Sequence, residues 1–191
     1  ATSTVSTTNK VTITLKKDGS NSTALNGYSI AVRTSATATT NVATGTTTTS
    51  ATLDITGQMT PVTTYYIFAG KDGSHQSDLV YSGVTFTGAA ATTATLNYYT
   101  LTVQLANATT TVNGTSKSNN STVVVLGGTT TASSNYGHAI VGGGATGYHF
   151  SSWSVVTGTA TIGSTSTAST TVKVASAATI KATGASNTVT I

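Results

Sequence analysis

Apolar and polar residues alternate along much of the chain, which is the pattern of half-buried β-strands. In the first half, Val11, Ile13 and Leu15 alternate with threonine and lysine, and the same period of two recurs at residues 28–32, 53–55, 84–86 and 96–98. The segment TYYIFAG (64–70) is a continuous apolar run, which predicts a strand that is covered on both faces.

The alternation restarts in NYYTLTVQL (97–105) and continues in six later segments, at residues 121–128, 137–144, 147–155, 159–163, 169–175 and 178–184. Segments rich in turn-forming residues separate the expected strands, at residues 17–22, 25–27, 56–61 and 70–78. Helical periodicity is absent from the sequence. Short strands at this spacing predict an all-β fold of two tandem small β-sandwich or β-roll-like domains.

The composition strengthens the all-β prediction. Of the 191 residues, 48 are Thr and 23 are Ser, there is no Glu, and only 6% are charged. Threonine loses side-chain freedom in a helix but packs well on a pleated sheet. Disordered chains combine low hydrophobicity with high net charge, whereas the mean hydropathy here is +0.10. We therefore expect an ordered protein.

We expect a domain boundary near residues 97–100, where the strand pattern restarts without a Pro- or Ser-rich linker. This boundary separates a prealbumin- or Ig-like sandwich (10–98) from a second β domain (99–191). An N-terminal extension (1–9) precedes the first domain. The extension has no Gly, Pro or charged residue. Val5 is at an odd-numbered position, as are the apolar residues Val11, Ile13 and Leu15 of the strand after it. This segment is a candidate donor strand for a neighbouring subunit, or a strand within its own sheet.

The C-terminal segment SNTVTI (186–191) is a rival donor, because Val189 and Ile191 also alternate with polar residues. Val5, Val189 and Ile191 are therefore the candidate subunit contacts.

Two sets of motifs resemble modules of secreted bacterial surface proteins. VTITLKKDG, GYSIAVRT, LDITG, YYIFAGKDG and the run ending in NYYTLTV resemble prealbumin-like surface modules. The second half, with YTLTVQL, GYHFSSWSVVTGTATI and STTVKVASAATIKAT, is similar to a divergent internalin-type B-repeat. The Gly-Tyr-x-Phe-x-x-Trp core of that family falls on Gly147, Tyr148, Phe150 and Trp153. The family has a short Gly-rich hairpin after its first strand, whereas ANATTTVNGTSKSNN (106–120) is longer here.

The segment GYHFSSWSV (147–155) contains the only tryptophan of the chain. In a domain of small side chains, we expect Tyr148, Phe150 and Trp153 to anchor the core, because large aromatic residues supply most of the apolar area. The alternative is an exposed aromatic platform that binds sugars.

Patterns that support catalysis or metal binding are missing from the sequence. There is no G-x-S-x-G motif, and with four Asp and no Glu few paired carboxylates can form. His75, His138 and His149 lack the spacing of a zinc site. Asp72 and Asp78 fit a polar loop better than a calcium site, which needs 6–8 oxygen ligands. We expect no enzymatic activity and no cofactor.

The net charge of +4 reflects a shortage of acids rather than a basic patch, because only Lys16 and Lys17 are adjacent. This pattern excludes a nucleic-acid partner, which requires clustered basic residues. No apolar run approaches the ~20 residues of a membrane span. The lack of Cys and the start at Ala1 fit a secreted protein whose signal peptide has been removed, and predict an extracellular or cell-surface location.

Five N-glycosylation sequons occur, at Asn21, Asn107, Asn113, Asn119 and Asn120. About this number is expected by chance in so Ser- and Thr-rich a chain. The group between residues 107 and 122 suggests a surface loop.

A Lys–Asn isopeptide bond with an acid catalyst is a further candidate modification. Lys10, Asp54 and Asn97 are the trio that the expected strands allow. The alternative is a solvated lysine and aspartate.

Few charges and one proline are available to protect the strand edges. The first functional hypothesis is an extracellular structural subunit of a filament, appendage or surface layer that assembles with itself by strand addition. The second is a pair of modules from an adhesin or a carbohydrate-binding cell-wall protein, with a glycan as partner. An accessory domain of a secreted enzyme is a weaker third.

Overall fold

The computed structural model describes residues 8–132 and 135–188. Within these residues the chain forms sixteen β-strands and two 3₁₀ helices, with no α-helix. This confirms the all-β, multi-sheet sandwich predicted from the alternation. No helix in the described part of the chain is long and apolar enough to cross a membrane.

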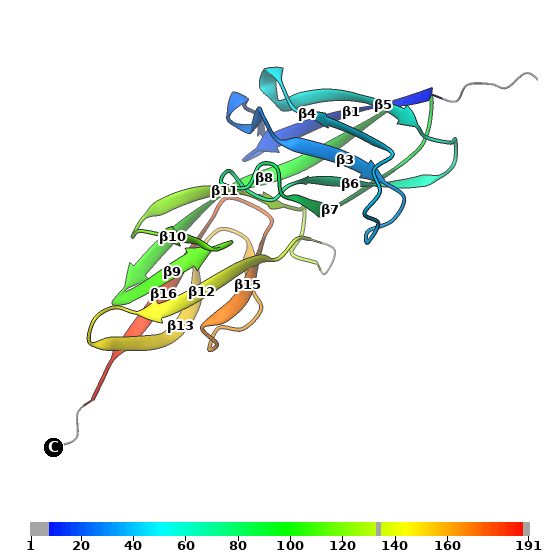
Figure 1. Cartoon of the computed structure of the whole chain (residues 1–191). Coiled ribbons are helices and arrows are strands. Elements are labelled where there is room, and N and C mark those ends of the chain that lie inside the picture. The colour runs from blue at the N-terminus through cyan, green and yellow to red at the C-terminus, as the bar shows by residue number, and fades with distance from the viewer. Residues whose placement is uncertain (1–7, 133–134, 189–191) are drawn as a thin grey trace, which may run out of the picture. The chain divides into compact units, whose positions relative to one another are not determined.

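The chain divides between Tyr98 and Tyr99 into two compact units, called unit 1 and unit 2 below. No linker separates them, because β8 (Ala91–Ala106) continues without a break from unit 1 into unit 2 (Figure 1). Its residues Ala91–Tyr98 pair with a strand of unit 1, and Leu101–Ala106 pair with a strand of unit 2.

Unit 1 contains seven further strands and both 3₁₀ helices. These are β1 (Thr8–Lys17), β2 (Ser20–Asn21), β3 (Ser29–Arg33), β4 (Ala43–Thr46), β5 (Thr52–Gln58), β6 (Thr64–Gly70), β7 (Leu79–Thr87), η1 (Thr23–Leu25) and η2 (Thr49–Ala51).

In unit 1, β1 lies between β5, which is antiparallel to it, and β8, which is parallel to it. The second sheet is antiparallel and has the order β4-β3-β6-β7. Val11, Ile13 and Leu15 of β1 are fully buried, as their alternation predicts. β6 is buried at most positions, as expected for a continuous apolar run.

The hairpin from β1 to β2 turns at Asp18 and Gly19, whose φ angles are 49° and 83°. Asp-Gly is a preferred pair for such a turn, because both positions need a left-handed backbone. This turn falls within the segment 17–22 that the sequence marks as a turn.

Unit 2 contains the rest of β8 and eight further strands. These are β9 (Ala108–Val112), β10 (Thr115–Lys117), β11 (Ser121–Gly127), β12 (His138–Gly144), β13 (Tyr148–Thr157), β14 (Ala160–Ile162), β15 (Ser169–Val174) and β16 (Ala178–Ser186).

In unit 2, β16 lies between β13, which is antiparallel to it, and β8, which is parallel to it. β11 also pairs with β8, and the second sheet has the order β10-β9-β12-β15-β14. The buried core consists mainly of small aliphatic residues around one tryptophan: Leu101, Val103, Ala108, Val112, Val123, Val125, Ile140, Trp153, Val172, Val174, Ala178, Ile180 and Ala182.

The interpretation of residues 107–122 as a surface loop is wrong. β9 and β10 form a hairpin there, and its turn is Asn113-Gly114, with φ angles of 49° and 80°. Ala108, Thr110 and Val112 are buried and alternate with the more exposed Thr109 and Thr111. Asn-Gly between alternating residues is a strong hairpin signal, but threonine at an inward position hides the alternation.

Candidate functional site

The aromatic residues of GYHFSSWSV do not share one environment. Trp153 is 2% exposed, and the ring of Phe150 packs against it with centroids 5.5 Å apart. The indole Nε1 donates to the carbonyls of Thr167 and Ala168 at 3.2 and 3.3 Å. Tyr148 is partly exposed at the first position of β13. Trp153 thus lies in the core of unit 2, and Phe150 packs against this core while partly buried, so the two rings do not form an exposed platform for sugars.

The glycine run in β12 makes room for these rings. A Cβ on Gly142 would lie 2.5 Å from Phe150 Cδ2 and 3.0 Å from Trp153 Cζ2, and a Cβ on Gly144 would overlap the carbonyl of Tyr148. A Cβ on Gly143 would meet only the Thr109 hydroxyl oxygen, at 2.7 Å. Glycine at positions 142 and 144 therefore makes room for the Phe150 ring and the Tyr148 backbone, whereas a side chain at 143 would require only the Thr109 hydroxyl to move.

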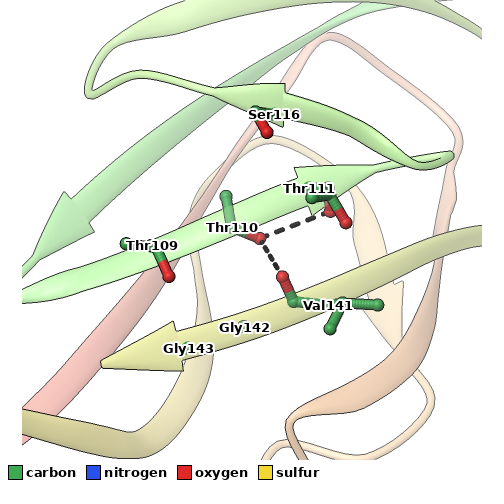
Figure 2. A pocket seen from close by; sticks show the side chains of 7 residues that line it. All are labelled: Thr109, Thr110, Thr111, Ser116, Val141, Gly142 and Gly143. Atoms are coloured by element: carbon green, nitrogen blue, oxygen red, sulfur yellow. Dashed lines mark hydrogen bonds between the residues drawn. The ribbon is translucent and has the colours of Figure 1, made fainter. Parts of the chain in front are cut away.

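A hollow of about 230 Å³ lies over β9, β10 and β12 (Figure 2). It is lined by Thr109, Thr110, Thr111, Ser116, Val141, Gly142 and Gly143, and no charged side chain is among them. The Thr110 hydroxyl donates to the Val141 carbonyl at 2.9 Å and is buried. Thr109 and Val141 are exposed, and Val141 is 45% exposed.

The candidate isopeptide trio does not meet. Lys10 Nζ lies 3.2 Å from Asp54 Oδ2, in an exposed ion pair. In the parallel register, however, Lys10 lies opposite Ala91, while Asn97 lies opposite Lys16. Six residues along a strand separate the two positions by roughly 20 Å. The prediction of this trio is therefore wrong, because β1 and β8 run parallel and place Asn97 at the far end of the ladder.

Two hydrogen bonds hold the Asp54 carboxylate in its charged form. The Thr12 hydroxyl donates to Asp54 Oδ1 at 2.6 Å, and Lys10 donates to Oδ2. These bonds lower the pKa of Asp54, with the Thr12 bond as the larger cause. Since the group is exposed, solvent screens the pair and its contribution to stability is small.

The sequon asparagines differ in how accessible their amide groups are. Asn21, Asn107 and Asn120 are exposed. Asn119 is also exposed, but its Oδ1 accepts a hydrogen bond from the Leu105 backbone N–H at 2.8 Å. Asn113 is engaged on both sides of its amide, as described next.

His138 is fully buried in unit 2 and connects three segments. The Asn113 Oδ1 accepts from the Ala139 N–H at 3.2 Å, so its Nδ2 faces His138 Nδ1, at 2.9 Å, as a donor. His138 Nε2 lies 2.6 Å from the Leu126 carbonyl oxygen, which can only accept. The bonds agree on one neutral tautomer, with the proton on Nε2. The sequence reasoning missed this contact.

The other two histidines have separate partners. His75 Nδ1 lies 2.9 Å from Asp72 Oδ1, and His149 Nδ1 lies 3.0 Å from Asn187 Oδ1. Among the described residues, no three potential metal-ligating side chains of His, Cys, Asp or Glu form a group.

Buried tyrosines surround Asp72 in unit 1. The rings of Tyr28 and Tyr98 meet edge to face with centroids 4.9 Å apart, and the Tyr98 hydroxyl donates to the Gly70 carbonyl at 2.6 Å. Burial raises the pKa of Tyr28, and the charge of Asp72 raises it further. The pKa of Tyr98 is also raised, by burial first and then by Tyr28 and Asp72. Sequence reasoning missed this cluster, because Asp72 belongs to a segment that looks like a polar turn.

The sheet edges are of two kinds. β4, β10 and β14 are short edge strands of three or four residues. β7 and β13 are longer edge strands with no Lys, Arg, Asp or Glu, and each ladder has register shifts. Val155 and Val156 of β13 are 37% and 46% exposed.

The candidate subunit contacts Val5, Val189 and Ile191 lie outside the described residues. The ladders beside the start of β1 are described, however. The last residue of β5, Gln58, pairs with Thr8, and the first residue of β8, Ala91, pairs with Lys10.

No protein-family model matches this chain, and no curated protein matches it in sequence.

Proposed function

We propose that the chain is an extracellular structural subunit of a filament, appendage or surface layer, whose copies join by β-strand addition. The observation that carries this proposal is the segment ATSTVST, which precedes β1 in the sequence and contains no Gly, Pro or charged side chain. Pairing with an open edge of another copy would supply its backbone with partners and give directional growth.

The edges of the sheets support the same proposal. A long edge strand without charges is a template for a further strand, and β7 and β13 have this composition. The chain contains 12 charged residues in total, so little repulsion opposes contact between copies. We further propose that the two units descend from prealbumin-like and B-repeat surface modules, and that the protein acts without catalysis.

Electron microscopy of the purified protein at neutral pH tests assembly. We expect filaments or sheets from the whole chain, and folded monomers from a variant that lacks residues 1–7. This deletion retains Asn9, whose side-chain amide donates to the Met59 carbonyl. A matched variant without residues 189–191 tests the rival donor. Filaments of normal length from the N-terminal deletion would exclude the N-terminal donor, and no assembly from the whole chain would overturn the proposal.

The second candidate is a module pair of an adhesin or a carbohydrate-binding wall protein. The hollow lined by threonine and serine on the five-stranded sheet favours it. Retention of the monomeric protein on an insoluble polysaccharide, without assembly, would favour this candidate over the first.

A further inference from the structure

Gly143 is the glycine of β12 that is not placed against the core rings or the Tyr148 backbone, because a Cβ there would meet the hydroxyl oxygen of the exposed Thr109, at 2.7 Å. Glycine within a strand weakens it, and it often marks a place where a ligand or another backbone approaches closely. A Cβ on Gly142 would clash with the Phe150 ring, and a Cβ on Gly144 would clash with the Tyr148 carbonyl. A side chain at 143 would meet only a rotatable hydroxyl, that of Thr109. The bare position instead forms part of the lining of the hollow in Figure 2.

The chemistry of the lining limits what can bind there. No charged side chain lines the hollow, so it cannot neutralise a phosphate, a carboxylate or a cation. Thr109, Thr111 and Ser116 contribute hydroxyl groups, each able to donate one hydrogen bond and to accept others. The threonine methyl groups and the exposed Val141 add apolar surface. A ligand that carries hydroxyl groups around an apolar ring matches this lining.

The backbone of the hollow is already paired, which argues against a peptide strand as the occupant. β9 and β12 are joined there through Thr111 and Val141, Thr110 and Gly142, and Thr109 and Gly143. Strand addition uses unpaired backbone groups at a sheet edge, whereas six of the seven lining residues belong to β9 and β12, which are interior strands of this sheet. The volume of about 230 Å³ is below the roughly 300–1,000 Å³ of pockets for drug-sized ligands, so it holds one small ring.

We propose that this hollow is a binding subsite for a single neutral sugar residue, with Gly143 as its floor and the hydroxyls of Thr109, Thr111 and Ser116 as its polar contacts. The proposal does not depend on filament assembly. Such a ligand makes few contacts, so a dissociation constant of about 1–10 mM is expected for an isolated monosaccharide. A polysaccharide that presents many copies to an assembled or surface-bound protein would be held more tightly by avidity.

Amide chemical shifts of the full chain, titrated with methyl glycosides, test the proposal. The probes are the methyl glycosides of glucose, galactose, mannose and N-acetylglucosamine, each added up to about 50 mM, five times the weakest expected dissociation constant. We expect at least one to shift the amides of residues 109–111, 116 and 141–143 in a saturable way. Absence of saturable shifts at these amides with all four probes would overturn the proposal.

Substitutions separate a specific subsite from weak general contact. Gly143→Val fills the floor with a residue that suits a strand, and should weaken binding at least tenfold. Thr111→Val retains the shape but removes one hydroxyl, and should weaken it about fivefold. Ala139→Val, an exposed position on the same strand outside the lining, is the matched control and should bind like the wild type.

Two further outcomes would count against the subsite. Unchanged binding by Gly143→Val, in a variant with an intact amide spectrum, would overturn it. Shifts at the same amides that depend on protein concentration without sugar would show that another copy occupies the hollow, and would also overturn it. Normal filaments from Gly143→Val would show that any loss of sugar binding is separate from assembly.

Discussion

Large side chains are spread through the core of unit 1, whereas unit 2 concentrates its aromatic area at one place. Unit 1 buries Tyr28 against Tyr98, Tyr65 against Phe86, and Phe68 apart from these two pairs beside the partly buried Tyr81. In unit 2, the fully buried core is composed of Val, Ala, Ile and Leu, with Trp153 as its one large ring and Phe150 partly buried against it. Both arrangements close a β-sandwich, but they make the two units sensitive to different changes.

The polar groups buried in the two units also differ. Unit 1 buries tyrosine hydroxyls near the carboxylate of Asp72. Unit 2 buries the neutral imidazole of His138, which connects the β9–β10 turn to β11. Buried polar groups are costly unless they are hydrogen-bonded, so each set fixes one arrangement of the segments that contribute to it.

The largest expected effect is that of Trp153→Ala. Removing the ring leaves a cavity in a core of small residues, and should destabilise unit 2 by about 3–5 kcal/mol, while unit 1 stays folded. Urea denaturation followed by amide spectra of both units measures the difference. Val156→Ala, an exposed position on the same strand, is the control and should change stability by less than about 0.5 kcal/mol. Equal loss of both units would show that their stabilities are coupled.

The second largest effect is expected for Gly142→Ala, which tests how tightly unit 2 is packed around Phe150 and Trp153. Gly142→Ala places a methyl group against Phe150 and Trp153, and should cost about 1–3 kcal/mol through overpacking. Gly143→Ala is the matched control, because its methyl group meets only the Thr109 hydroxyl. A larger loss from position 143 than from position 142 in thermal unfolding would contradict this description of the core.

The third effect concerns unit 1 at high pH. The folded pKa values of Tyr28 and Tyr98 are raised, so the fold favours the neutral hydroxyls. Their contribution to stability is complete below the unfolded pKa of about 10, and is lost as the pH rises from there toward the folded values. We expect these two tyrosines to ionise only as unit 1 unfolds, in a titration of absorbance near 295 nm alongside circular dichroism. Full ionisation of every tyrosine at about pH 10 with the fold intact would be inconsistent with the structure.

The smallest effect is expected for Asp54→Asn. The Lys10–Asp54 pair is exposed, and exposed pairs contribute little. The pKa of Asp54 is lowered, so what the carboxylate contributes is present above its unfolded pKa and is lost as the pH falls through the folded value. We expect no measurable change in the urea midpoint at pH 7. A shift as large as that of Gly142→Ala would show that the pair has a structural role.

The sequence predicts those strands in which apolar residues mark the inward face. Val11, Ile13 and Leu15 are of this kind, and so is the continuous run of β6. β4 (ATGT) was missed because alanine is its one apolar side chain, and β9 (ATTTV) was missed because threonine occupies both inward and outward positions there. In a chain of this composition, the register with neighbouring strands decides which threonines are buried, and the local pattern does not show it.

Contacts between distant segments were predicted only in part. The sequence placed Lys10 and Asp54 on successive strands, and the structure joins them. Asn97 is far from both because β1 and β8 pair in parallel, and parallel pairing depends on how the chain crosses between sheets. The contact of His138 with Asn113 depends on the β9–β10 turn, which was not predicted because residues 107–122 were expected to form a surface loop.

The parallel strands next to β8 determine how each unit would respond to mechanical load. In unit 1, a pull on the chain before Thr8 and after Tyr98 acts on β1 and β8, which are parallel neighbours. In unit 2, a pull at Tyr99 and after Ser186 acts on β8 and β16, which are also parallel neighbours. In both cases the force runs along the strands, so the evenly spaced hydrogen bonds of a parallel ladder share the load in shear rather than opening one after another. The rate of forced unfolding governs survival under tension, and this geometry slows it in both units.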